Sequence, residues 1–391
     1  MSRDKRADGI ELTRREALRL LTVGPAAVVI TACMPARSSS DGVAAPPASP
    51  SPSDALAGGR SGPPQPLATP ARARTTPIDA PKPRDFGIDS DITLTPNADF
   101  YSVTYHPGEP PALDPATWRL RIDGLVNVAQ ELSLGDIQAL PAVVEMRTLE
   151  CISNPVGGNL ISNAVWKGVA CADVLKLAGV HPRAREVKMQ AADGYHTAIP
   201  VELALHPRSL LVYEMNGEPL PAEHGFPLRC LWPGRYGQKQ PKWLTHMELI
   251  SGHYLGHWES QGWSNQASIR PNSQIRRPDD TTVLSPEPHV IAGLAFAGEA
   301  GVATVEVSTD DGKTWHEAEL KQAPAPFTPY VWTEWSYYWQ DPQPGSHTLL
   351  ARVTDGAGAT QQRGRRRLLL SGTFPDGTNK MHEVRVTVRR S

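Results

Sequence analysis

Cysteine is scarce in this chain, and the position of each cysteine limits the chemistry that it can do. The 391 residues contain four cysteines, including Cys33 near the start. Cys171 precedes a predicted helix and Cys230 lies inside a predicted apolar strand, so both are interpreted as small buried side chains, with a disulfide between them left open. Cys151 ends a predicted strand and opens a glycine-containing loop. A thiolate there is placed to act as a nucleophile or a metal ligand, and a buried structural role is the alternative.

The pattern of apolar residues predicts the elements that position this loop. Strands are expected at 118–124, 143–151, 187–191, 210–214 and 228–232. Short helices are expected after the Ser133–Asp136 capping box and at 173–179, where Gly179 suits a left-handed C-cap. This mixture predicts an α+β domain over residues 86–278.

The C-terminal region, residues 279–391, shows strand patterns without a helical period. Strands at 304–308 and 314–320 flank a turn at Asp311-Gly312, and further strands are expected at 331–335, 346–354 and 384–388. Short strands separated by turn residues predict an immunoglobulin-like β-sandwich, with a boundary near Pro278–Pro288.

The first 85 residues are predicted to direct and tether the protein. Arg14-Arg15 before a weakly apolar stretch resembles a twin-arginine export signal over residues 1–33. Ile30-Thr31-Ala32-Cys33 resembles a bacterial lipobox, in which Cys33 would be acylated. A short amphipathic helix with an incidental cysteine is the alternative. Residues 34–85, rich in Pro, Ala and Ser, are expected to form a disordered linker. The expected location is periplasmic, or lipid-anchored on the outer face of the cytoplasmic membrane.

The overall composition excludes some classes of function. Lysine and arginine number 39 against 41 acidic residues, a formal charge of −2, which argues against a nucleic-acid binder. No apolar run reaches the roughly 18 residues that a transmembrane helix needs.

Three motifs, in this order along the chain, resemble the sulfite oxidase family. Thr148–Asn154, followed by Trp166-Lys167-Gly168, resembles the loop whose cysteine binds molybdenum. His224–Arg229 with Tyr236–Leu244 resembles the molybdopterin-binding stretch, and Gly298–Trp315 resembles the C-terminal dimerisation domain. The resemblance covers about residues 90 to 390. It implies a sulfite-oxidase-like fold, a molybdenum centre with a single molybdopterin, Cys151 as metal ligand, and a homodimer.

The resemblance also implies further site residues. The implied cofactor contacts are Asn97, Tyr101, Cys151, Asp193, His224, Arg229, Lys239 and Lys242. The implied catalytic residues are Cys151, Asn154, Tyr236 and Trp263. A molybdopterin phosphate needs charge-assisted donors, which the arginine, the lysines and the histidine would supply. A solvated charged face is the alternative for the basic residues.

The chain departs from sulfite oxidases at the positions of two anion-binding arginines. Pro155 and Val156 occupy one position, Ser102 and Val103 occupy the other, and Trp263 stands where an active-site tyrosine is expected. Each lost charge-assisted hydrogen bond removes about 1.5–3 kcal/mol of anion binding. The pocket is therefore predicted to be neutral and aromatic, with Tyr236, Trp258 and Trp263 as walls, and to suit a sulfoxide or another neutral oxygen acceptor.

The favoured hypothesis is an exported, lipid-anchored molybdenum oxidoreductase that transfers an oxygen atom to or from a small substrate in a two-electron reaction. No Cys-x-x-Cys-His motif occurs, so no haem is expected in this chain, and electrons would pass to a separate cytochrome or quinone-linked protein. The alternatives are a sulfite oxidase proper, a cofactor-free surface adhesion protein, and an enzyme with a cysteine nucleophile.

Overall fold

The computed structural model describes residues 67–68, 81–105, 107–364 and 372–390, all within one compact unit. The predicted export signal with Cys33, and most of the predicted linker, lie outside these residues. No helix in the described ranges is long and apolar enough to cross a membrane.

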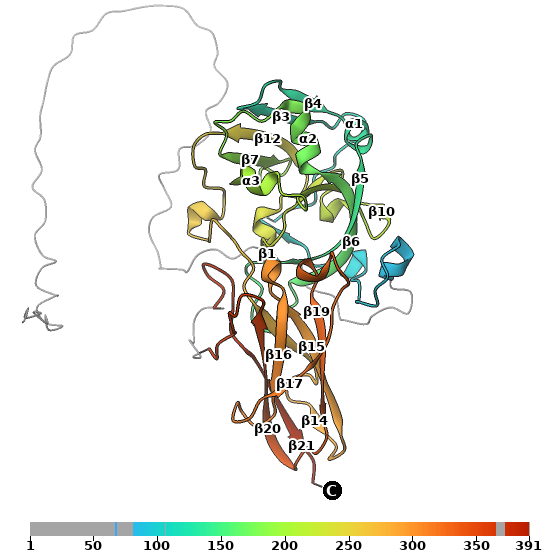
Figure 1. Cartoon of the computed structure of the whole chain (residues 1–391), viewed down its shortest axis with the longest axis vertical. Helices are drawn as coiled ribbons and strands as arrows, with labels where there is room; N and C mark the ends of the chain where they lie inside the picture. Colours follow the sequence, from blue (N-terminus) through green and yellow to red (C-terminus); the bar gives the residue numbers. More distant parts are fainter. Residues whose placement is uncertain (1–66, 69–80, 106, 365–371, 391) are drawn as a thin grey trace, which may run out of the picture. The chain divides into compact units, whose positions relative to one another are not determined.

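The first domain contains two five-stranded sheets (Figure 1). One sheet has the order β10-β9-β6-β5, with β11 also paired to β9. Its strands are β5 (Ala142–Glu150), β6 (Ile161–Ala170), β9 (Leu210–Met215), β10 (Glu218–Pro219) and β11 (Arg229–Leu231). The other has the order β4-β3-β12-β7-β8, with only the β3–β12 pair parallel. Its strands are β3 (Leu120–Gly124), β4 (Gln130–Leu132), β7 (Glu186–Ala191), β8 (His196–Pro200) and β12 (Leu244–Ile250).

Short helices and a small ribbon complete this mixed α+β domain. The helices are α1 (Leu134–Gln138), α2 (Cys171–Ala178) and α3 (Val201–Ala204), and β1 (Leu67–Ala68) pairs with β2 (Val103–Thr104). The predicted capping box is confirmed, since Asp136 N donates to Ser133 Oγ at 3.1 Å and Ser133 N to Asp136 Oδ2 at 2.9 Å. Gly179 ends α2 with a φ of 69°, which favours glycine, but its ψ of 96° lies outside the left-handed α region that was predicted.

The predicted strand at 143–151 is confirmed as β5, which ends one residue before Cys151. Strand β6 was not predicted, because nearly every one of its residues is buried and its sequence therefore lacks alternation. β5 and β6 pair along their whole length, so an unpredicted strand holds the strand that leads to Cys151.

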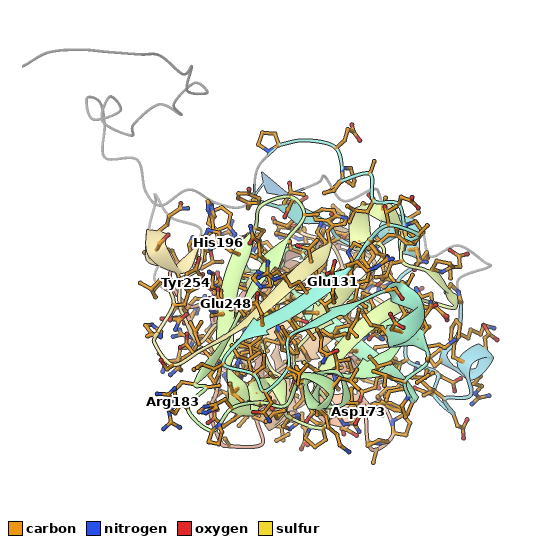
Figure 2. All side chains as sticks on the ribbon, turned by 90° about the horizontal axis from the view of Figure 1, so that it is seen from above. Glu131, Asp173, Arg183, His196, Glu248 and Tyr254 are labelled. Carbon is orange, nitrogen blue, oxygen red and sulfur yellow. The ribbon has the colours of Figure 1, made fainter. Side chains whose placement is uncertain are left out.

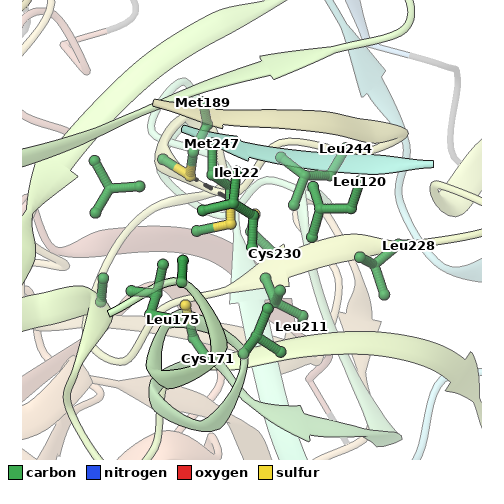
Figure 3. Packing of buried hydrophobic residues seen from close by; sticks show 14 of the residues in the cluster. Leu120, Ile122, Cys171, Leu175, Met189, Leu211, Leu228, Cys230, Leu244 and Met247 are labelled. Atoms are coloured by element: carbon green, nitrogen blue, oxygen red, sulfur yellow. Dashed lines mark hydrogen bonds between the residues drawn. The ribbon is translucent and has the colours of Figure 1, made fainter. Parts of the chain in front are cut away.

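The core of the first domain lies between the two sheets and α2 (Figure 3). Cys171 and Cys230 are fully buried in it, and the Cys230 Sγ contacts Met189 Sδ at 3.7 Å. Both thiols are free, so no disulfide joins them. Their interpretation as small buried side chains is confirmed.

The second domain is a β-sandwich whose two sheets enclose a separate apolar core. One sheet has the order β13-β15-β19-β18, with strands β13 (Asn272–Arg277), β15 (His289–Phe296), β18 (Glu319–Lys321) and β19 (Thr333–Trp339). The other has the order β14-β21-β20-β16-β17, with strands β14 (Val283–Leu284), β16 (Val302–Ser308), β17 (His316–Glu317), β20 (Gly345–Asp355) and β21 (His382–Val388). The finer immunoglobulin-like assignment stays a prediction.

Two expectations for the sandwich need correction. The boundary predicted at residue 278 falls too late, because β13 already pairs with β15 inside a sandwich sheet. The single strand expected at 314–320 is divided, since β17 pairs with β16 whereas β18 pairs with β19 in the opposite sheet. Ala318 is buried between these two short strands, where the chain changes sheet.

The sandwich packs directly on the strand that leads to Cys151. A mixed cluster joins Met146 and Val165 of the first domain to Phe296 and Trp332 of the second. The Trp332 backbone N–H donates to Thr148 Oγ1 at 2.9 Å. The second domain therefore helps to fix β5.

Candidate active site

An open pocket brings together side chains from distant segments. Six predicted cofactor contacts line it, namely Tyr101, Cys151, Asp193, His224, Arg229 and Lys242. The predicted residues that do not line it are Asn97, Asn154, Tyr236, Lys239 and Trp263. The wall also holds Trp258, which was expected there, and several aromatic side chains that were not.

Cys151 is the first residue after β5, and hydrogen bonds of its backbone N–H and carbonyl fix its position. Its N–H donates to Leu160 O at 2.9 Å, and its carbonyl accepts from Asn154 N at 2.9 Å. The Sγ lies 3.1 Å from Ser153 Oγ, and burial raises the pKa of the thiol. In the described ranges, no group of three or more His, Cys, Asp or Glu side chains could hold a metal.

Arg229 is a buried cation in the pocket wall, and only 5% of the residue is exposed. Its guanidinium donates to the His224 carbonyl oxygen at 3.0 Å and lies over the Trp166 ring at 5.2 Å. The Nε has no partner, and no carboxylate in the described part of the chain pairs with this arginine. Burial lowers its pKa to about 10.

Lys242 supplies a second cation to the same wall. Its Nζ donates to Ser102 Oγ at 3.1 Å and to the Glu223 carbonyl oxygen at 2.9 Å, and lies over the Trp243 ring. Burial, followed by repulsion from Arg229, lowers its pKa to about 7. Two half-satisfied cations in one pocket would attract an anion such as a phosphate. The donor set therefore fits a molybdopterin, with a soft thiolate for its metal.

Gly225 keeps the two basic residues close together. Its φ is 112°, and a Cβ there would lie 3.0 Å from Arg229 Cβ and 3.1 Å from Lys242 Cα. Any larger residue would be strained in this conformation and would push the two side chains apart.

The depressed pKa of Lys242 makes the stability of the cofactor-free protein depend on pH. The unfolded lysine has a pKa near 10.4, so between about pH 7 and 10 the unfolded chain binds more protons. Stability should therefore rise with pH in this window, by on the order of 2 kcal/mol relative to Lys242→Met. Urea unfolding of both proteins at pH 6.5 and 9.5 measures this difference. Parallel changes in the two proteins would contradict it.

His224 faces the pocket as a neutral ring. Burial lowers its pKa to about 4, and its Nε2 lies 3.0 Å from the Asn97 carbonyl oxygen, so Nε2 carries the proton. The Asn97 side chain points elsewhere, donating to Met215 O at 3.2 Å and accepting from Asn216 Nδ2 at 2.9 Å. Asn97 thus positions His224 and does not itself line the pocket.

The pocket wall holds two buried tyrosines, of which Tyr101 was a predicted cofactor contact and Tyr195 was not. Tyr195 Oη donates to the Gln238 carbonyl oxygen at 2.5 Å, and the Tyr195 N–H donates to Asp193 Oδ1 at 3.0 Å. Burial raises the pKa of Tyr195 and of Tyr101, so both hydroxyls stay protonated at neutral pH. Tyr195 lies two residues after Asp193, which was predicted as a cofactor contact, and this adjacency was the available signal.

His257 lies against two aromatic residues of the pocket wall. His257 makes edge contacts with Tyr105 at 4.8 Å and Trp258 at 4.7 Å between ring centres. His196, whose ring also contacts His257, is hydrogen-bonded through Nδ1 to Tyr254 Oη at 2.9 Å, and Figure 2 shows these two residues close together.

Three other predicted residues lie behind the wall. Lys239 is 1% exposed and its Nζ is 2.6 Å from Glu259 Oε1, so it neither faces the pocket nor forms a solvated face. Tyr236 Oη accepts from Arg270 N at 3.1 Å. Trp263 packs edge-on against Phe374 of the second domain. Their direct roles toward a ligand stay predictions.

Comparison with known proteins places this pocket in context. The family model "Oxidoreductase molybdopterin binding domain" matches residues 107–258, and "Mo-co oxidoreductase dimerisation domain" matches residues 264–387. Mitochondrial sulfite oxidase of Rattus norvegicus is 31% identical over 303 residues, which are 66% of this chain and 55% of that protein. Sulfite oxidase of Arabidopsis thaliana is 31% identical over 299 residues, which are 63% of this chain and 75% of that protein.

A solved structure shares the fold. The sulfane dehydrogenase SoxCD from Paracoccus pantotrophus superposes with a TM-score of 0.64 at 22% identity, covering 76% of this chain and 84% of that chain. The present chain spans about half the length of the rat protein and three quarters of the Arabidopsis protein.

Proposed function

The chain belongs to the sulfite oxidase family, and on this premise we propose that it is a molybdenum-molybdopterin oxidoreductase acting on a small substrate. One observation carries the proposal: Arg229 and Lys242, two cations without carboxylate partners in the described chain, line the same pocket as the Cys151 thiol. Metal analysis tests it. About one molybdenum per chain is expected from a host that makes molybdopterin, and none would refute it.

The bound cofactor would supply two-electron oxygen-atom transfer. Cys151 would bind the metal through its thiolate, and Arg229 with Lys242 would hold the phosphate by charge-assisted hydrogen bonds. The chain itself contributes orientation and a largely apolar pocket wall. The protonated hydroxyl of Tyr101 can donate a hydrogen bond within the pocket, and the low polarity of the aromatic wall strengthens such polar contacts.

We propose a neutral substrate, such as a sulfoxide, over the sulfite anion. The charged residues in the pocket wall are Asp193, Arg229 and Lys242, since His224 is neutral. If both cations hold the cofactor phosphate, none remains for a substrate anion. Sulfite is the second candidate, because the curated relatives are named for it. Rates with dimethyl sulfoxide and a reduced viologen, against rates with sulfite and ferricyanide, separate the two substrates.

The proposal extends to partners and location. The match to a dimerisation domain supports a homodimer through the sandwich. Electrons would be exchanged with a separate cytochrome or quinone-linked protein. Export by the twin-arginine route and an acylated Cys33 are proposed from the sequence alone, since those residues lie outside the described ranges.

Replacing Arg229 with methionine should weaken retention of the cofactor without destabilising the cofactor-free protein. Loss of one charge-assisted hydrogen bond of about 1.5–3 kcal/mol should weaken cofactor retention roughly 10- to 100-fold. The cofactor-free protein should be as stable as the wild type or more stable, because a partly unsatisfied buried cation is removed. Molybdenum per chain after gel filtration and thermal unfolding measure the two effects.

The matched control is Arg235→Met, which removes a nearby arginine that pairs with Glu299 outside the pocket wall. It should retain the cofactor. Equal loss of molybdenum in both variants would show that Arg229 has no special role.

A further inference from the structure

Glu150 joins the Cys151 loop to the second domain. The residue is 2% exposed and immediately precedes Cys151. Its Oε1 accepts from Asn154 Nδ2 at 2.9 Å, and its Oε2 accepts from Asn272 Nδ2 at 3.0 Å. Asn154 belongs to the loop, whereas Asn272 begins β13 of the sandwich. One carboxylate thus connects two domains beside the candidate metal ligand.

The two neighbouring amides are fixed in orientation. Asn154 Oδ1 accepts from Leu160 N at 3.0 Å, so its amide cannot flip without losing this bond. Asn272 Nδ2 also donates to Arg270 O at 3.2 Å and lies 3.4 Å from Phe296 O. Residue 150 therefore meets N–H donors on both sides. Only a side chain with two acceptor oxygens satisfies both donors, and a carboxylate is such a group.

The sandwich contacts the far side of the same loop as well. Arg276 donates to Gly158 O at 3.1 Å and to Asn159 Oδ1 at 3.2 Å. The His382 ring lies so close to Gly157 that a Cβ there would clash with it. The loop is therefore held by the second domain at both its start and its end.

We propose that Glu150 is a positioning residue, a bridge with one acceptor oxygen on each side, through which the sandwich fixes the Cys151 loop and so the placement of the Cys151 sulfur. The bridge gives the second domain a task in the active site besides any role in dimerisation. It also gives Asn154 a positioning role in place of the predicted catalytic one. The part that concerns a metal rests on the proposed function.

Replacing one carboxylate oxygen of residue 150 by an amide nitrogen tests the bridge without changing the size of the side chain. Glu150→Gln leaves an amide N–H facing another N–H donor. The double variant Glu150→Gln/Asn154→Asp restores complementarity, because the carboxylate introduced at position 154 can accept from both Leu160 N and the new amide, while the side chain at position 150 still accepts from Asn272. Asn154→Asp alone should be worse, since it brings two carboxylates together.

Three quantities are measured for each variant of the full chain. They are hydrogen exchange of the Leu160 amide, molybdenum per chain, and the visible absorption that a thiolate gives when bound to the metal. In Glu150→Gln, exchange should be about tenfold faster and the absorption should shift. The double variant should return both to the wild-type values, with the thermal unfolding midpoint measured alongside.

The outcomes separate the possibilities. A single variant with unchanged absorption at full molybdenum content would overturn the positioning role, even if its unfolding midpoint fell. A double variant as perturbed as the single one would overturn the bridge. If the wild type held no molybdenum, the proposed function would fail, and Leu160 exchange alone would decide whether Glu150 fixes the loop.

Discussion

Cys151→Ala should abolish turnover while about one molybdenum per chain remains, because the pterin can retain the metal without the protein thiolate. Changing a group that only supports a metal ligand typically costs 10- to 100-fold in activity, so loss of a ligand itself should exceed about 100-fold. The thiolate-to-metal absorption should disappear as well. Assays with both substrate pairs, together with metal analysis and a visible spectrum, measure these effects.

The chain offers two matched controls for this substitution. Cys171 and Cys230 are fully buried in the apolar core and do not line the pocket. Alanine at either position removes a thiol and costs only about 1 kcal/mol of stability, with activity and spectrum retained. Full activity in Cys151→Ala would exclude the ligand role. Equal inactivation by all three substitutions would indicate a folding defect.

The sequence located the centre of the site because that centre depends on local patterns. The apolar pattern predicted the strand that ends before Cys151, and the resemblance of short motifs to the sulfite oxidase family placed Arg229 and Lys242 at a common pocket. The three cysteines were distinguished by their immediate neighbours. Such inferences need only a few adjacent residues, and tertiary packing did not reverse them.

Features that depend on distant segments were not accessible. Strand β6 carries no alternation because both of its faces are buried. The bridge from Glu150 to Asn272 joins residues 122 positions apart, and nothing in the surrounding sequence marks it. Lys239 looks like a phosphate donor beside Lys242, but Glu259 reaches it across the fold. The type of a charged residue is visible in the sequence, whereas its partner is set by topology.

The second large expected effect concerns the Lys239–Glu259 ion pair, and it is an effect on stability rather than on catalytic activity. The two side chains are 1% and 0% exposed, and Lys239 Nζ also donates to Thr197 Oγ1, Ala198 O and Asn265 Oδ1. Burial lowers the pKa of Lys239, against the opposing effect of Glu259. Lys239→Met should destabilise the protein by about 3–5 kcal/mol, because Glu259 is left buried and uncompensated. Urea unfolding of the cofactor-free chain measures this loss.

The double variant Lys239→Met/Glu259→Gln distinguishes a broken pair from damaged packing. Removing both charges avoids an isolated buried carboxylate, so most of the lost stability should return. The difference between the double variant and the sum of the single variants gives the coupling between the two residues. If Lys239 instead held the cofactor phosphate, Lys239→Met would lower molybdenum content with little effect on the cofactor-free protein. A Lys239 paired with Glu259 in the core and a Lys239 facing the pocket therefore predict different effects of Lys239→Met on the stability of the cofactor-free protein.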